Sequence, residues 1–402
     1  MNLRHLNLKY ALVNIGFMLL VSGSLGFAYN YLSQSGFDDG TIGTTMSLIS
    51  LIGVFVGPAA ADLVDRSRRI TQKMFVIASM VVCAAFSAIL LVIPKGSFLI
   101  LPVIVIAFMC STVGMPLLNG MAFIYEKSGG VINYGLCRGL GSAAYAVGSN
   151  VVGRLWGAIG RNTLPIWVVL MAVLTIVAME LMPAAPKEGG EGKEGAASES
   201  ISILQFFARY KKVTIVVVSL VLMYFCHFII QNYMAKIIAV FQLKGVEEIQ
   251  GNALFIAAIL ELPTMFGFSL LMKRFDIKQI LVVASIFYSI KHVVVLLANS
   301  VPMFYAAMAL QMLSYAAITP AVVYFANECV AEADRNKGQA VFATASTVGG
   351  LLASFLGGWL FQFFSVRLVL TVGVIASIAG TILMVVGTKG VGSAKRSVSV
   401  RM

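Results

Sequence analysis

Apolar runs long enough to cross a lipid bilayer recur along the whole chain. A bilayer core about 30 Å thick needs about 20 consecutive apolar residues in an α-helix. Backbone groups in lipid must pair within their own segment, so each run is predicted to be helical. The predicted spans are 8–31, 41–62, 72–94, 97–125, 134–159, 163–184, 212–238, 247–272, 277–298, 301–330, 336–363 and 366–388. The chain is therefore predicted to be an all-α membrane protein with twelve transmembrane helices.

The composition agrees with a protein solvated by lipid. Of the 402 residues, 59% are hydrophobic and only 11% are charged, whereas soluble domains carry about 25% charged residues. The net charge of +12 comes from basic residues in short loops between apolar runs, a distribution that favours anionic lipid over nucleic acid as partner. The five cysteines form no CxxC pair and are predicted to be buried free thiols.

One polar stretch divides the spans into two sets of six. It runs from Pro183 to Glu199 and is rich in Gly, Glu and Lys, which is typical of a flexible linker. Residues 200–212 that follow are predicted to form a short amphipathic helix on the membrane surface. The predicted divisions are an N-terminal bundle 1–184, a linker 185–211, a C-terminal bundle 212–388 and a tail 389–402.

Lysine and arginine predict the orientation in the membrane. They concentrate in the termini and in the even-numbered loops, and the odd-numbered loops hold only Lys95, Arg161, Lys244 and Arg367. Cytoplasmic loops carry the excess of basic residues. Both termini and the linker are therefore predicted to be cytoplasmic, in a multi-pass protein of the cell membrane.

The two halves carry similar turns after their second spans. Acidic and basic residues stand together at 61–69, which includes Asp65, Arg66 and Arg69, and again at 271–278. With six plus six spans and a central linker, this turn resembles the major facilitator superfamily. The resemblance implies a fold of two six-helix bundles and a gating role for Asp65, Arg66 and Arg69. Ala61 stands where that family usually has its leading glycine.

A closer resemblance is to the lactose permease and oligosaccharide–proton symporter group, with its phenylpropionate and nucleoside permease relatives. The segments that carry it are 134–145, 227–233, 260–266 and 289–291. It implies sugar contacts at Arg138 and Tyr145 and an essential intramembrane acid at Glu261. The chain departs from the group at Asn119, the best match to an acidic residue of span 4. It also departs in span 10, where Gln311 and Ser314 replace a His and a Glu.

Four ionisable residues stand inside predicted spans: Arg138, Lys236, Glu261 and Lys291. Charges at this depth cost several kcal/mol and usually face a water-filled cavity. One interpretation is a site for substrate and proton coupling, with Glu261 carrying the proton and Lys291 adjusting its affinity. The alternative is a structural ion pair between helices, and for Lys236 a side chain that snorkels to the interface.

Helical spacing groups further polar residues. Arg138, Ser142 and Tyr145 share one face of span 5, and a guanidinium, a hydroxyl and an aromatic ring suit a hydroxylated solute. His227 and Gln231 share a face of span 7, with Asn232 about 140° around the helix. Gln311 and Tyr315 share a face of span 10. All these residues, with Asn119, are predicted to bind substrate; the alternative is helix packing.

These features together predict a secondary transporter that works by alternating access, and the resemblance implies proton-coupled uptake of a sugar or oligosaccharide. The alternatives are transport of a nucleoside or an aromatic or organic acid, drug export, or a membrane receptor or scaffold. The chain shows no catalytic motif, metal-ligand spacing or nucleotide-binding loop, so we expect no enzymatic activity, cofactor or metal. Its expected partners are a small-molecule substrate, protons and the lipid bilayer, and it is expected to be monomeric.

Overall fold

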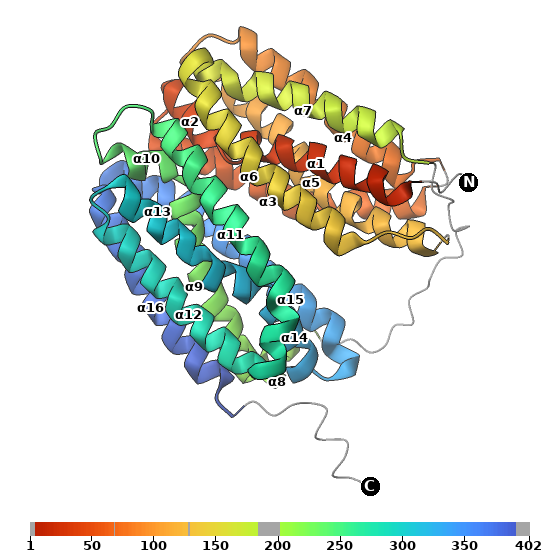
Figure 1. Cartoon of the computed structure of the whole chain (residues 1–402), viewed down its shortest axis with the longest axis vertical. Coiled ribbons are helices and arrows are strands. Elements are labelled where there is room, and N and C mark those ends of the chain that lie inside the picture. The colour runs from red at the N-terminus through yellow and green to blue at the C-terminus, as the bar shows by residue number, and fades with distance from the viewer. Residues whose placement is uncertain (1–4, 68, 128, 184–201, 391–402) are drawn as a thin grey trace. The chain divides into compact units, whose positions relative to one another are not determined.

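The computed structural model describes residues 5–67, 69–127, 129–183 and 202–390, and within them every regular element is a helix (Figure 1). The packing divides the chain into two compact units. Unit 1 comprises residues 1–191 and 232–259, and unit 2 comprises residues 192–231 and 260–402. A stretch of the second predicted bundle therefore packs within unit 1.

Unit 1 contains the helices of the first half of the chain and one short helix of the second. They are α1 (Leu6–Ser24), α2 (Ala28–Gln34), α3 (Asp39–Arg66), α4 (Gln72–Val92), α5 (Ile100–Lys127), α6 (Tyr134–Ile159), the 3₁₀ turn η1 (Gly160–Asn162), α7 (Thr163–Glu180) and α10 (Met234–Ala239). The long helix α11 (Val246–Arg274) begins in unit 1 and ends in unit 2.

Unit 2 contains the remaining helices. They are α8 (Ile203–Arg209), α9 (Lys211–Asn232), α12 (Ile277–Leu297), α13 (Val301–Ala309), the 3₁₀ helix η2 (Leu310–Leu313), α14 (Tyr315–Cys329), the 3₁₀ turn η3 (Glu332–Asp334), α15 (Arg335–Phe363) and α16 (Val366–Thr388). Only the last residue of α9 lies on the unit 1 side of the division.

The described helices account for twelve membrane crossings. Eleven helical segments are long and apolar enough to span a bilayer, and one of them, 134–180, has 47 residues. A helix of that length is about 70 Å long, more than twice the thickness of a bilayer core. Its interruption at η1 divides it into the two predicted spans, and α6 has the predicted bounds 134–159.

Polar side chains set where several helices begin. Thr71, Asn133 and Ser365 each accept a hydrogen bond from a backbone amide in the first turn of the helix that follows. Asp276 and Gln279 form a reciprocal capping box at the start of α12. Such caps satisfy amide groups that have no partner within the helix. The position of a capping residue in the sequence therefore sets where the helix begins.

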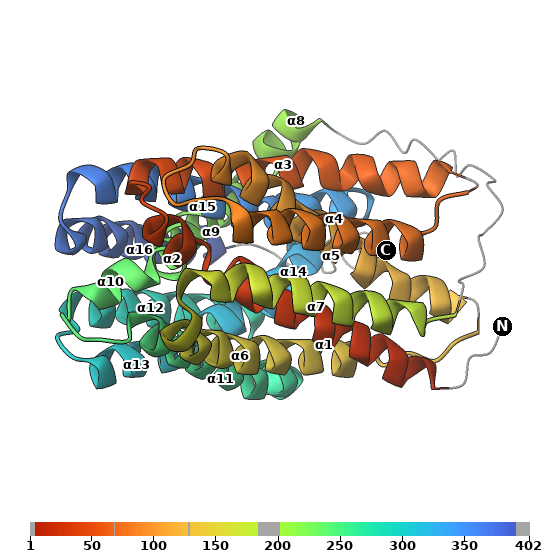
Figure 2. The same cartoon turned by 90° about the horizontal axis from the view of Figure 1, so that it is seen from above.

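Helix α1 is the close-packed centre of unit 1. It lies against α6 and α7 (Figure 2). A Cβ atom at Gly16 would lie 2.9 Å from Oγ1 of Thr175, and one at Gly148 would lie 2.3 Å from Oγ of Ser22. Small residues thus let these helix backbones approach closely, which is how helices pack when lipid surrounds them.

Helix α9 has the equivalent place in unit 2. A Cβ atom at Gly349 of α15 would lie 2.6 Å from Cβ of Tyr224, and Oγ of Ser219 donates a hydrogen bond to the carbonyl of Gly380 in α16 at 2.6 Å. Spans 1 and 7 therefore make comparable glycine contacts with the last two spans of their halves. This similarity agrees with the internal repeat seen in the sequence.

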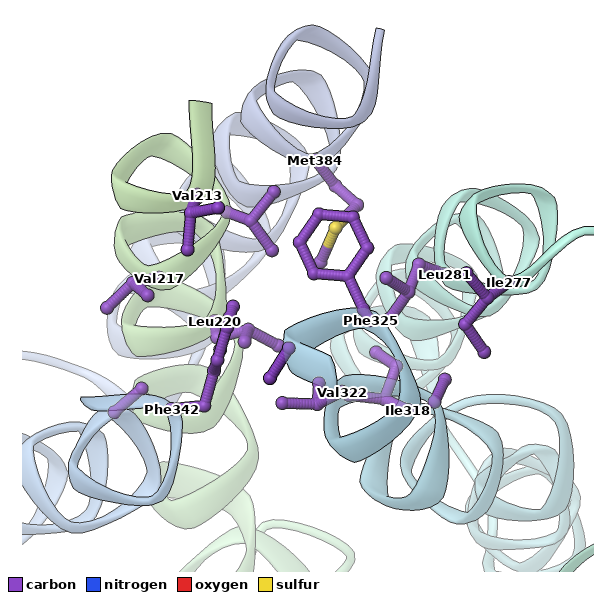
Figure 3. Close-up of a cluster of buried hydrophobic side chains, with 14 of the residues drawn as sticks. Val213, Val217, Leu220, Ile277, Leu281, Ile318, Val322, Phe325, Phe342 and Met384 are labelled. Atoms are coloured by element: carbon purple, nitrogen blue, oxygen red, sulfur yellow. The ribbon is translucent and has the colours of Figure 1, made fainter. Parts of the chain in front are cut away.

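A buried apolar cluster fills one end of unit 2 (Figure 3). Leu220, Leu281, Phe325 and Met384 come from α9, α12, α14 and α16. Phe206 of α8 is fully buried in the same cluster. Helix α8 is therefore anchored in the core of unit 2 by this ring, in addition to the amphipathic surface role predicted for it.

Candidate functional site

Three polar side chains form a continuous chain inside unit 2. The ammonium group of Lys291 donates to Oε1 of Gln311 at 2.5 Å, and the Gln311 amide nitrogen donates to Oε1 of Glu261. The residues come from α12, η2 and α11, and Lys291 is only 1% exposed. A cation and a carboxylate at membrane depth are thus connected through one amide group.

The local structure explains how these side chains reach one another. Span 10 is interrupted by η2, and Gln311 lies within this 3₁₀ segment, a feature that often marks functional positions in long helices. Pro263 lies inside α11, two residues after Glu261. Because proline has no amide hydrogen, the carbonyl of Ile259 loses its usual helical donor. A 3₁₀ segment thus contains Gln311, and a helical proline lies close to Glu261.

The geometry gives Gln311 a defined electrostatic role. A glutamine side chain has one accepting oxygen and one donating nitrogen. Its oxygen faces the Lys291 ammonium and its nitrogen faces the Glu261 carboxylate. Each charge thereby has a partner, which reduces the cost of removing it from water. The two charges are connected through this amide group.

Aromatic rings lie next to this polar chain in unit 2. The rings of His227 and Tyr315 stack with centroids 4.6 Å apart and planes 10° apart. The ring centroid of Tyr288 lies 6.0 Å from that of His227, and the Tyr288 ring stacks on His292 with centroids 5.3 Å apart. His227 Nδ1, Tyr288 Oη and His292 Nε2 are buried without a hydrogen-bond partner. The predicted residues Gln231 and Asn232 are half-buried near the end of α9.

Unit 1 contains the predicted span-5 residues on α6. A guanidinium nitrogen of Arg138 donates to Oγ of Ser142 at 3.0 Å, so these two side chains do share a face. Tyr145 is half-buried one turn further along α6, and Asn119 is half-buried on α5. In the described part of the chain, no carboxylate forms an ion pair with Arg138. Lys291, by comparison, is connected to Glu261 through Gln311.

Lys236, for which snorkelling to the interface was the alternative interpretation, has an acidic partner in unit 1. Its ammonium group forms an ion pair with Asp39, and both side chains lie within unit 1. Tyr29 donates from its hydroxyl to the other carboxylate oxygen of Asp39 at 2.7 Å. The lysine is therefore held by a defined acidic partner.

The predicted gating residues lie at the end of α3. Arg66 pairs with Asp62 one turn earlier in the same helix at 2.7 Å, and Arg69 is exposed. Asp65 belongs to α3, but its side chain lies outside the described residues. The described contacts of this turn are thus within the turn and its own helix.

Comparison with known proteins decides the family. The sequence pattern of the MFS_1 like family matches residues 11–372. The chain belongs to the MFS_1 like family. It is therefore a multi-pass membrane transporter of the major facilitator type, and the predicted fold class is confirmed. Among curated proteins, none matches the sequence.

Solved structures agree on the fold of this MFS_1 like protein. The nucleoside transporter NupG is 16% identical with a TM-score of 0.80, covering 97% of this chain and all (100%) of its own. A bacterial homologue of the human lysosomal transporter Spinster is 13% identical, with a TM-score of 0.67 over 97% and 96% of the two chains. A POT family peptide transporter is 10% identical, with a TM-score of 0.70 over 95% and 96%.

A second polar cluster of the MFS_1 like protein ties α8 to the segment before α15. Arg209 pairs with the carboxylate of Asp334 at 3.2 Å, and the Tyr210 hydroxyl donates to the same group at 2.7 Å. Burial, and then the hydrogen bond to Asp334, raise the pKa of Tyr210. The hydroxyl therefore remains protonated and acts as a donor at neutral pH.

Several contacting residues were missed by the sequence analysis. Tyr288 and His292 flank Lys291 on α12, and Tyr29 binds Asp39. His292 is one of only three histidines in the chain and lies inside a predicted span. Intramembrane histidines are rare and are often functional, so that signal was present. Nothing in the sequence around Tyr29 indicated its contact with Asp39.

Proposed function

We propose that this protein is a proton-coupled secondary transporter in which Glu261 carries the proton. The observation that carries the proposal is the chain from Lys291 through Gln311 to Glu261. A carboxyl group inside a membrane protein can be loaded and released if its cationic partner does not neutralise it permanently. Gln311 bridges Lys291 and Glu261, and in this proposal the carboxylate exchanges its hydrogen bond from Gln311 for a proton.

Proton loading and solute binding are connected through Gln311. When Glu261 is ionised, its carboxylate holds the Gln311 amide nitrogen. Protonation removes the anionic acceptor, and a hydrogen bond to a neutral group is weaker than one to a charged group. The amide is then available to a solute hydroxyl. By linkage, a solute that binds Gln311 raises the proton affinity of Glu261 by the same factor.

The substrate class proposed first is a sugar or oligosaccharide, taken up into the cell by alternating access. Arg138, Ser142 and Tyr145 on α6 offer donors and a ring to a hydroxylated solute. Asn119, Gln231 and Asn232 are proposed as further polar contacts. The excess of basic residues on one side supports cytoplasmic termini in the cell membrane.

A nucleoside is the second candidate, and a specific observation favours it. The stacked rings of His227 and Tyr315 offer an aromatic surface of the kind on which a nucleobase can stack. The structure of NupG, described as a nucleoside transporter, also resembles this chain. A nucleoside retains a hydroxylated sugar, so the contacts proposed on α6 suit both classes.

Uptake into proteoliposomes with and without an inward proton gradient tests the proposal. Solutes are first selected by thermal stabilisation of the purified protein, using sugars, nucleosides and carboxylic acids, because a bound ligand raises the melting temperature. Glu261→Gln is expected to lose gradient-driven accumulation but retain solute counterflow. Glu248→Gln, which changes an exposed acid of the same helix, is the matched control.

Two results contradict the proposal. If Glu261→Gln accumulates solute as the native protein does, then Glu261 does not carry the proton. If accumulation does not depend on the gradient in the native protein, then the transporter is not coupled to protons.

A further inference from the structure

Residues 232–259 belong by sequence to the second set of six spans but pack within unit 1. The segment contains α10 and the first half of α11. Its most prominent polar contact is the ion pair of Lys236 with Asp39, two residues separated by 197 positions in the chain. Their side chains are only 25% and 14% exposed. Tyr29 supports the pair through its hydrogen bond to Asp39 and an edge contact with Tyr233.

Further polar contacts follow along the same segment. Gln34 donates to the Glu247 carboxylate at 2.7 Å and accepts from the indole of Trp156 at 3.0 Å. Gln250 donates to the backbone carbonyl of Gly26 at 2.7 Å. The bonds of Glu247 and Gln250 join residues 232–259 to the first half of the chain, and the bond from Trp156 holds Gln34 in place. Polar contacts, which water can replace, therefore form a part of the attachment beside the buried apolar side chains of the segment.

The crossing of α6 and α11 is made by glycines. A Cβ atom at Gly153 would lie 2.4 Å from the carbonyl oxygen of Glu247, and one at Gly251 would lie 2.5 Å from that of Ser149. No side chain can interdigitate at these points. Two smooth backbone surfaces can separate there without any side chain having to withdraw from a pocket.

A helix boundary lies at one end of the segment, and a proline lies inside α11 just beyond the other end. Tyr233 separates α9 from α10, with φ −111° and ψ 24°. At the other end, Pro263 leaves the carbonyl of Ile259 without its usual helical donor. Positions that absorb backbone rotation in conformational changes are typically found at such element boundaries. The segment is thus built to move as one piece.

We propose that Asp39, Lys236 and Tyr29 form a latch that fastens residues 232–259 to unit 1 and that opens during the transport cycle. By the predicted orientation, this end of the protein is the one away from the cytoplasm. Removal of either charge leaves the other buried without its partner, which favours the state in which the segment has separated and both groups are hydrated. The latch therefore sets the balance between the fastened and the released segment.

Hydrogen exchange of the purified full-length protein, followed by mass spectrometry, tests the latch. Asp39→Asn and Lys236→Gln are each expected to speed exchange of the amides in 234–252 by about tenfold, equivalent to about 1.4 kcal/mol. The double variant Asp39→Lys with Lys236→Asp, in which the two charges are swapped, is expected to restore slow hydrogen exchange. Amides of α12 are the internal reference. Tyr29→Phe, which keeps the ring, is expected to have a smaller effect in the same direction.

Asp38→Asn is the matched control, because it makes the same charge change one residue away. Asp38 accepts a hydrogen bond from Thr41 within α3 and is not part of the latch. A second measurement uses Ser149→Cys, a buried position whose carbonyl lies against Gly251; maleimide labelling of this thiol is expected to accelerate with Asp39→Asn.

Equal rates of hydrogen exchange in Asp39→Asn and Asp38→Asn would overturn the latch. A charge-swapped double variant that does not regain slow hydrogen exchange would overturn it as well. If Asp39→Asn or Lys236→Gln does not fold, the milder Tyr29→Phe decides, and unchanged exchange in that variant also rejects the proposal. Neither measurement needs a solute or a proton gradient, so its outcome is independent of the proposed proton coupling.

Discussion

Unit 1 and unit 2 each bury a lysine near a carboxylate, but they connect the two groups differently. Lys236 contacts Asp39 directly, and a tyrosine hydroxyl occupies the second carboxylate oxygen. Lys291 and Glu261 are bridged by the side chain of Gln311. A direct ion pair stabilises one arrangement of the two segments that carry it. An amide group between the charges can instead be released by the carboxylate when a proton binds.

The difference indicates how similar side chains serve different purposes in one membrane protein. An ion pair in direct contact favours two distinct states, in which the segments that carry the charges are either together or apart. An inserted amide favours a group that changes its protonation while the surrounding helices stay in place. Four substitutions test how the two units hold their charged and closely packed groups.

The largest effect is expected from Lys291→Met. This change leaves Glu261 and Gln311 without their buried cation, and breaking a buried pair in this way costs about 3–5 kcal/mol. Thermal unfolding in detergent measures the loss. Combining it with Glu261→Gln is expected to recover much of the stability. If the double variant is as unstable as the sum of both single variants, then Gln311 does not couple the two charges.

Gly251→Ala is expected to weaken the attachment of residues 232–259. The new methyl group would meet the carbonyl of Ser149, and overpacking of this kind costs about 2 kcal/mol. Hydrogen exchange of α10 reports the effect. Gly157→Ala is the control, since a Cβ atom at Gly157 meets nothing within 4 Å. Equal effects of the two variants would mean that the α6–α11 crossing is not closely packed.

Gln311→Leu is expected to cost about 1.5 kcal/mol, because both charges lose a hydrogen-bond partner and only part of the loss is regained by apolar packing. The measurement is the melting temperature at acidic and at neutral pH. A smaller loss is expected in acid, where a protonated Glu261 needs no donor. A loss that does not depend on pH would indicate that Gln311 acts only in packing.

The smallest effect is expected from Asp38→Ala, at about 1 kcal/mol for loss of a helix N-cap. The backbone amide of Thr41 lowers the pKa of Asp38 below its ordinary value. The ionised cap therefore adds stability above that ordinary pKa and loses it as the pH falls through the lowered pKa. Asp38→Asn is expected to keep the cap without this pH dependence. Thermal unfolding over a pH series distinguishes the variants.

Hydropathy predicted the spans well because it reports length and polarity, and α6 and α16 have the predicted bounds. It could not predict the interruptions inside spans. Span 10 changes to a 3₁₀ helix at Leu310–Leu313, although this segment contains neither proline nor glycine. The break depends on tertiary contacts of Gln311, which a local pattern does not contain.

The site was predicted as single residues and not as pairs. Glu261, Gln311 and Lys291 were each selected because polar groups at membrane depth are rare, but their connection through Gln311 depends on three different helices. Lys236 was selected as well, but Asp39 was not. Their pairing depends on packing between segments 197 residues apart, which the spacing of residues along one helix cannot reveal.

The division into units has a consequence for the integrity of the chain. Residues 232–259 belong to unit 1, whereas the residues directly before and after them belong to unit 2. A single break in the chain between the two sets of six spans would leave residues 232–259 on the second fragment, joined to the first fragment by their packing within unit 1. A transporter cut there is expected to remain a single particle on size-exclusion chromatography in detergent, and to separate into two fragments on a denaturing gel.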